Sequence, residues 1–135
     1  MGDLYINHWA VFVCAIVNIA VGALWYSPLM FYKAWKSANN LSDDDLKKAN
    51  LPKMHITSFI LSLIISYNLA FFLGDANTDW SWGLSAGFMA GLGWAAAIFA
   101  IIALFEQKSW KYIFINAGYI VVYFTIVGFI LGLWR

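Results

Sequence analysis

Residues 82–105 read WGLSAGFMAGLGWAAAIFAIIALF, an apolar run without Asp, Glu, Lys or Arg. A helix needs ~20 apolar residues to cross the ~30 Å hydrocarbon core of a bilayer, so this run is long enough to span it. Three more charge-free runs of similar length occur at 8–26, 55–73 and 112–134. Backbone polar groups inside hydrocarbon must be paired within their own segment, so such runs form helices. We expect an all-α, polytopic membrane protein, with four transmembrane helices in a single membrane domain, 1–135.

The composition supports this interpretation. Hydrophobic residues make up 63% of the chain and charged residues only 11%, against roughly 25% charged in soluble domains. This balance excludes a soluble enzyme, and a net charge of +1 provides no basic field for a nucleic acid. The leader before the first run contains no Lys or Arg, and no Ala-x-Ala site follows that run. We therefore expect a retained helix rather than a signal peptide, with the lipid bilayer as partner.

The lysines predict the orientation. Seven of the eight basic residues lie in two connections, 27–53 and 106–111, and only Arg135 lies elsewhere. In a four-helix chain both connections are on the same side, which the positive-inside rule makes cytoplasmic. We therefore expect both termini outside, together with the acidic residues that lie in the other segments, Asp3, Asp75 and Asp79.

The connection 27–53 is long enough to hold structure of its own. Residues 29–36 mix bulky apolar groups with two lysines, which is typical of a helical segment in the membrane interface. Ser42 with three acidic residues after it predicts an N-cap and a short helix that Pro52 closes. The other two connections are short, so the second, third and fourth spans are expected to pack as antiparallel neighbours.

Small residues recur at every fourth position along each span. This spacing predicts close packing of the helices in lipid. These stripes include Gly22 in the first span, Ser58, Ser62 and Ser66 in the second, Gly83, Gly87 and Gly91 in the third, and Gly128 and Gly132 in the fourth. They can pack within one chain or between copies. We expect a homo-oligomer, in which the 83–91 face is one candidate interface.

A few polar residues lie inside the spans, where each needs a partner or a purpose. Asn18 is in the middle of the first span and most simply hydrogen-bonds to Ser62 or to a neighbouring chain. Tyr119 and Tyr123 lie in the fourth span, four residues apart, which is about one helical turn. These four residues either hold the helices together or line a polar path through the membrane.

Glu106 is the only carboxylate that directly adjoins a span on the lysine-rich side. It either forms a boundary salt bridge or makes one wall of a cytoplasmic vestibule for a cation or an amine. His8 and His55 are predicted at opposite boundaries, so the sequence predicts no metal site and no cofactor. No acid–base pair accompanies a nucleophile, and we do not expect an enzyme.

Two signatures resemble the bacterial domain-of-unknown-function family 1761. One is Gly22-Ala-Leu-Trp-Tyr-Ser-Pro-Leu with Phe31 and Trp35, and the other is Leu104-Phe-Glu106 with Trp110, Lys111 and Ile115-Asn-Ala-Gly-Tyr119. The family often has a histidine where this chain has Ile120. The resemblance implies a four-helix protein of the bacterial inner membrane and no established activity.

The signatures fall mostly on the expected cytoplasmic face, where we predict that any binding site opens. Its candidate residues are Trp25, Tyr26, Ser27, Lys33, Trp35, His55, Glu106, Trp110, Lys111 and Asn116.

Three functions remain open from the sequence. The protein is an oligomeric permeation or transport protein for an ion or small solute, an accessory or assembly subunit of a larger membrane complex, or a lipid- or hydrophobe-binding membrane protein. The sequence favours transport, although no broken helix and no charge at the midplane is expected, and transporters usually show one.

Overall fold

The computed structural model describes residues 4–135, and Asp3 lies outside the described part. Every regular element in this part is helical. The elements are α1 (His8–Trp25), α2 (Tyr32–Ala38), α3 (Asp43–Lys47), α4 (Leu51–Phe72), α5 (Trp80–Ala90), the π-helical η1 (Gly91–Ala96), α6 (Ala97–Phe105) and α7 (Trp110–Leu133). Four spans are long and apolar enough to cross a membrane: α1, α4, the continuous α5–η1–α6 and α7. The predicted fold class is confirmed.

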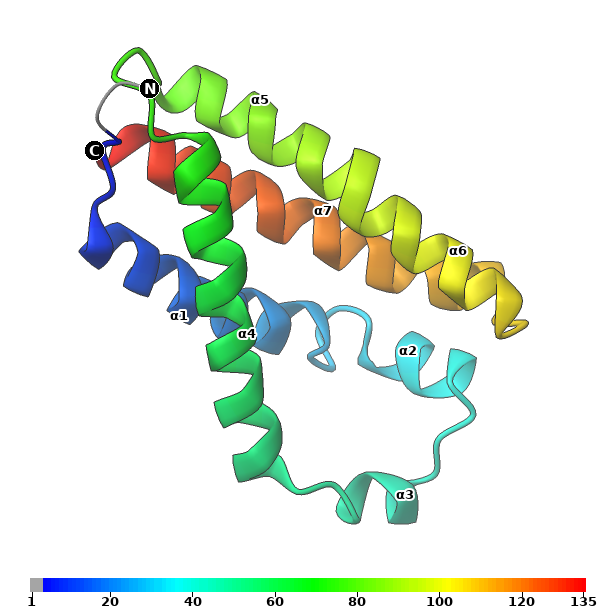
Figure 1. Ribbon diagram of the computed structural model, residues 1–135. Helices are drawn as coiled ribbons and strands as arrows, with labels where there is room; N and C mark the ends of the chain where they lie inside the picture. Colours follow the sequence, from blue (N-terminus) through cyan, green and yellow to red (C-terminus); the bar gives the residue numbers. More distant parts are fainter. Residues whose placement is uncertain (1–3) are drawn as a thin grey trace.

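The start of α1 and the end of α7 lie at one end of the bundle, which we call the terminal end (Figure 1). The connection from α1 to α4 and the turn from α6 to α7 carry most of the lysines, and we call their end the lysine end. At the terminal end the Tyr5 N–H donates to the Gly74 carbonyl at 2.9 Å. The Arg135 guanidinium donates to the carbonyls of Leu73 and Asp75 at 2.5 and 2.6 Å. These bonds join the terminal segments to the α4–α5 loop.

Side-chain caps begin the spans. Asn7 accepts from the backbone at the start of α1, Asp79 at the start of α5 and Ser109 at the start of α7. The second span begins at Leu51 rather than at residue 55, because Asn50 caps it and Pro52 occupies its first turn. Proline is tolerated there, since first-turn N–H groups have no partner within the helix. Pro52 therefore opens the membrane helix instead of closing the short helix before it.

The connection between α1 and α4 contains two short helices. Hydrogen-bonded turns occupy Ser27 to Phe31, so α2 begins at Tyr32, later than expected. In α3 the Ser42 hydroxyl accepts from the Asp45 N–H, and the Asp45 carboxylate accepts from the N–H and hydroxyl of Ser42. These bonds to the charged form lower the pKa of Asp45. Lys36 donates to Asp43 and links the two helices, and this hydrogen bond raises the pKa of Lys36.

The third and fourth spans run side by side along their whole length (Figure 1). Small residues allow this approach: a Cβ on Gly83 would overlap the carbonyl oxygen of Gly128, and one on Gly87 would overlap that of Phe124. A Cβ on Gly132 would likewise overlap the carbonyl oxygen of Asp79. The glycine face at 83–91 is therefore covered by α7 of the same chain.

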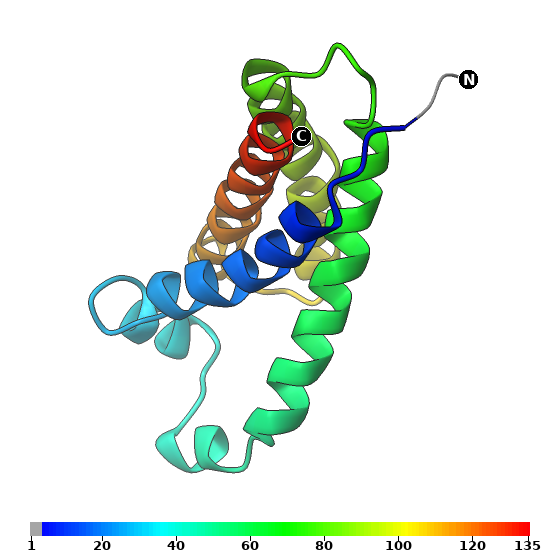
Figure 2. The same ribbon diagram turned by 90° about the vertical axis from the view of Figure 1, so that its left-hand side faces the viewer.

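The second span does not pack along the third. α4 crosses α1 and diverges from α5 directly after their shared loop, as both views show (Figures 1 and 2). The expectation of antiparallel neighbours is right for the third and fourth spans and wrong for the second and third. The face of α5 that carries the small residues packs against α7. The small residues of α4, Ser62 and Ser66, are buried elsewhere in the bundle.

The core lies where α1, α4 and α7 meet, in the half of the bundle nearer the terminal end. Its most buried members are Ala10, Val11, Cys14, Leu73 and Val127. The other half of α4 is different, because residues 51–58 are all exposed. The core therefore holds α4 by one half only.

The third span is not a regular α-helix. Gly91–Ala96 forms a π-helical segment in its middle, between α5 and α6. Such segments are rare and occur frequently at functional sites. The span remains continuous, as expected from the sequence, and the π-helical segment widens its middle without breaking it.

Candidate functional site

A polar cluster joins three spans at mid-length. The Asn18 side-chain amide donates to the Ser62 hydroxyl, and the Tyr119 hydroxyl donates to the Asn18 side-chain oxygen. Ser62 donates in turn to the carbonyl of Ser58 at 2.7 Å. Asn18 is near the middle of α1 and Ser62 near the middle of α4. The Asn18–Ser62 contact expected from the sequence is therefore present, and Tyr119 extends it to α7.

The cluster continues toward the lysine end through aromatic contacts. The Tyr26 ring lies 5.5 Å from the Tyr119 ring and 5.8 Å from Trp35 of α2, between centroids. The Tyr26 hydroxyl donates to the Asn116 side-chain oxygen at 2.5 Å. The Trp25 indole N–H donates to the Ile115 carbonyl at 2.9 Å. Four of the predicted cytoplasmic-face residues are thus brought together, and they join α1, α2 and α7.

Toward the terminal end the polar row has a gap. The hydroxyls of Ser66 and Tyr123 are buried and have no hydrogen-bond partner within residues 4–135. Beyond them, His8 Nδ1 and the Tyr67 hydroxyl are hydrogen-bonded at 2.9 Å. Polar side chains therefore occur at every level of the bundle, but hydrogen bonds do not connect them from end to end.

The remaining predicted residues are not gathered into one place. Glu106 is exposed in the α6–α7 turn and forms no ion pair within the described part of the chain. Lys108 instead lies over the Tyr112 ring, 5.3 Å from its centroid. Ser27 donates locally to the Leu24 carbonyl. The side chains outside the joined group are exposed at the lysine end: Lys33, His55, Trp110 and Lys111.

No group of three or more His, Cys, Asp or Glu side chains within residues 4–135 has an arrangement that could hold a metal ion. The free Cys14 is fully buried in the core.

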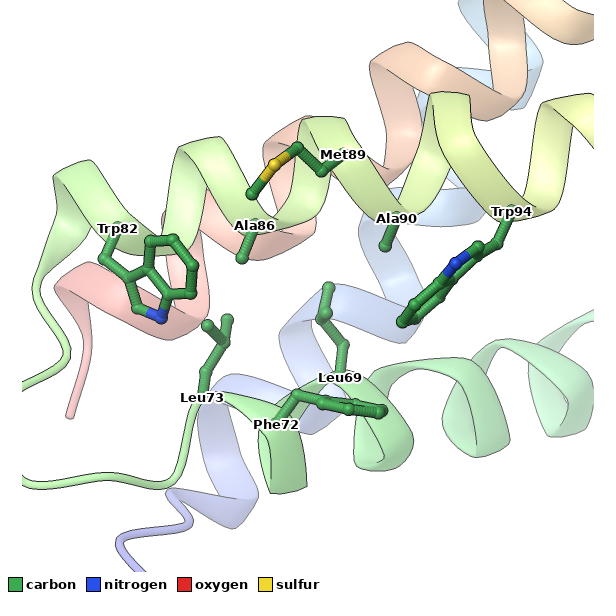
Figure 3. Close-up of a pocket in the computed structure, with 8 residues that line it drawn as sticks. All are labelled: Leu69, Phe72, Leu73, Trp82, Ala86, Met89, Ala90 and Trp94. Carbon is green, nitrogen blue, oxygen red and sulfur yellow. The ribbon is translucent and has the colours of Figure 1, made fainter.

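An apolar wedge between α4 and α5 was not anticipated from the sequence. The divergence of these helices leaves a hollow of about 290 Å³, with side chains from both helices turned into it (Figure 3). Its lining contains no charged residue and consists of Leu69, Phe72, Leu73, Trp82, Ala86, Met89, Ala90 and Trp94. A concave, aromatic-lined surface of this kind is typical of sites that bind hydrophobic ligands.

A second hollow of about 300 Å³ adjoins the first. It shares Leu69, Phe72, Ala90 and Trp94 with the first hollow, and it is completed by Ile64, Ile65, Asn68 and Phe124. The Asn68 amide donates to the Ile64 carbonyl of its own helix at 2.8 Å. Asn68 is the only polar side chain in this lining.

Trp94 is the one tryptophan far from both ends of its span. In a regular α-helix, twelve residues would place Trp94 ~120° around the axis from Trp82. The wider π-helical turn at Gly91–Ala96 rotates less per residue and moves Trp94 back toward the face of Trp82. Tryptophans are most common at the boundaries of membrane spans, so the mid-span position of Trp94 was the signal in the sequence that could have identified it.

The four spans, their apolar surfaces and the intramembrane polar cluster define a multi-pass helical membrane protein. Residues 9–132 match the family model described as "Protein of unknown function (DUF1761)", and the chain belongs to this family. The family indicated by the two signatures is thereby confirmed. No curated protein and no solved structure matches the chain.

Proposed function

We propose that this protein binds a hydrocarbon chain, taken from the bilayer, in the wedge between α4 and α5. The observation that carries the proposal is the divergence of two helices that a short loop joins, which leaves an apolar hollow of about 290 Å³. Among the three functions left open by the sequence, lipid or hydrophobe binding uses this hollow directly.

The chemistry of the wedge supports one kind of occupant. Ligand contacts there come from aliphatic and aromatic side chains, and the surrounding solvent is hydrocarbon. Trp82 and Trp94 line the hollow twelve residues apart, which is ~18 Å along a helix at 1.5 Å per residue. One leaflet contributes about half of the ~30 Å hydrocarbon core, so a single lipid chain has a suitable length.

Photo-crosslinking in lipid nanodiscs tests this proposal. A long-chain alkyl probe with a diazirine should label residues 69–73 and 82–94 preferentially, and an unlabelled chain should compete for these positions. Ala86→Phe, which places a ring in the hollow, should abolish the competable label. Ala97→Phe on the exposed surface of α6 is the matched control. Labelling spread evenly over all lipid-facing surfaces, without competition, contradicts the proposal.

Permeation of an ion or small solute is the second candidate, and the polar row across α1, α4 and α7 favours it. Asn18, Ser62 and Tyr119 form one hydrogen-bonded cluster, and two further buried hydroxyls lie beyond it. Such groups are costly in hydrocarbon and often mark solute paths. Purified protein in liposomes should then conduct protons or a small cation, and Asn18→Leu should stop the flux. Liposomes that stay as tight as empty ones eliminate this candidate.

Alongside either function, we propose that the protein assembles with other chains. It either forms a homo-oligomer or docks to a larger membrane complex. Native mass spectrometry from a gentle detergent distinguishes them. A multiple of the chain mass supports self-association, and a second protein species supports an accessory role.

A further inference from the structure

The two hollows of the wedge meet at a pair of aromatic rings. Phe72 of α4 and Trp94 of η1 line both hollows, and their ring centroids are 5.9 Å apart. Figure 3 shows the two side chains converging from opposite helices at the end of the wedge away from Trp82. The pair is the place where an occupant of one hollow would reach the other.

Both rings extend beyond the buried inner surface of the wedge. Leu69 is buried, whereas Phe72 and Trp94 expose 68% and 66% of their surface. Contacts on the exposed sides of these rings are therefore made with the bilayer and not with the protein. The rings can rotate aside without breaking the core, because neither has a buried position within it.

We propose that the Phe72–Trp94 pair determines how long a chain the wedge accepts. With the rings in contact, a chain occupies the first hollow, between Trp82 and Trp94. Without one ring, the two hollows of about 290 and 300 Å³ form one continuous groove. A longer chain then gains dispersion contacts with the second hollow that a shorter chain cannot reach. This inference rests on the proposed function of the wedge.

The π-helical segment explains why the pair exists. Gly91 lies against α7, where a Cβ would come within 2.7 Å of the Phe124 Cβ. Gly93 has open space around it, with no atom within 4 Å of the position of a Cβ. The segment therefore keeps its contact with α7 on one side and turns Trp94 toward α4 on the other.

Octyl and hexadecyl diazirine probes, used in nanodiscs, test the inference. In the natural chain both probes should label the first hollow at 69–73 and 82–94. In Trp94→Ala the hexadecyl probe should also label 64–68, with an increase of about threefold at this segment, while octyl labelling there stays constant. Phe72→Ala should give the same change. This second variant keeps the test valid if Trp94→Ala does not fold, because Phe72 lies in the regular helix α4 and not in the π-helical segment.

Trp80→Ala is the matched control, since Trp80 packs against Phe129 outside the wedge. An unchanged label distribution in both ring variants, or an equal change in the control, overturns the inference and leaves the proposed function standing. If no probe gives competable labelling in the wedge of any variant, the proposed function itself fails.

Discussion

Gly87 of α5 and Gly128 of α7 lie so close that a methyl group on either would enter the other helix. A Cβ on Gly128 would come within 2.9 Å of the Gly87 Cα, and one on Gly87 within 3.1 Å of the Gly128 Cα. Because backbone faces backbone here, no side chain can move aside to relieve an overlap. The hairpin formed by the third and fourth spans depends on this contact.

Gly87→Ala should therefore destabilise the protein by about 1–3 kcal/mol, the usual cost of overpacking. Thermal denaturation in a mild detergent measures the change. Gly93→Ala is the matched control, because it adds the same methyl group in open space, and it should not lower the stability. Equal destabilisation by both variants would show that the close approach is not the cause.

Asn18→Ala should loosen the crossing of α1, α4 and α7. The variant removes the bonds that the Asn18 side chain makes with Ser62 and Tyr119, at a cost of about 1 kcal/mol for polar contacts in lipid. Asn68→Ala is the control, since Asn68 bonds only to its own helix, and its effect should be smaller. The reverse order of the two melting temperatures would contradict the role given to the cluster.

Tyr26→Phe should weaken the attachment of the lysine end of α1 to α7. The ring contacts with Trp35 and Tyr119 remain, but the bond to Asn116 is lost, at about 1 kcal/mol. Hydrogen exchange should become faster in α2, which packs on this group. Tyr32→Phe leaves the Asn116 bond intact and should leave exchange in α2 nearly unchanged.

The helix α3 should lose order in acid. Its Asp45 has a lowered pKa, so the carboxylate stabilises the folded segment above the unfolded pKa and this stabilisation disappears as the pH falls through the folded value. Amide protection in α3 should therefore decrease below about pH 4, near the ordinary Asp value. Asp45→Asn should remove this pH dependence in hydrogen exchange. Asp44→Asn removes an equal charge outside the capping box and should preserve it.

The lysine distribution predicts which side each connection faces. Cysteines at Lys33 and Lys108 should react with a membrane-impermeant maleimide only after the cells are opened, whereas one at Asn77 should react in intact cells. The natural Cys14 is fully buried and should stay unlabelled, so it need not be removed. Labelling of Lys33→Cys in intact cells would reverse the orientation.

The sequence was sufficient for the four spans, because charge-free runs of this length have one solution in lipid. For Asn18 it gave two alternatives, Ser62 or a neighbouring chain, because a polar side chain at the middle of a span needs a partner, and the structure shows the bond to Ser62. The family followed from two local signatures, which the match over residues 9–132 bears out. These features depend on composition, depth and short strings.

The wedge could not be predicted in the same way. A short loop requires the end of α4 and the start of α5 to be close together. It does not require the two helices to stay in contact beyond the loop. The outcome depends on which helix covers the glycines of α5, and in the structure α7 covers them, with Gly128 and Gly132 against Gly83 and Gly87. The π-helical turn that carries Trp94 lies against Phe124 of α7, and it has no distinct sequence pattern.

The exposed N-terminal half of α4 affects how the protein behaves when it is removed from the bilayer. Residues 55–58, which belong to the expected span, are all exposed, so tertiary packing does not hold them helical. In hydrocarbon their backbone groups have no water to bond with, and the bilayer itself enforces the helix. Lipid thus acts as a structural component of this protein, and replacing it with a wetter medium should unwind that arm before the hairpin of glycines separates.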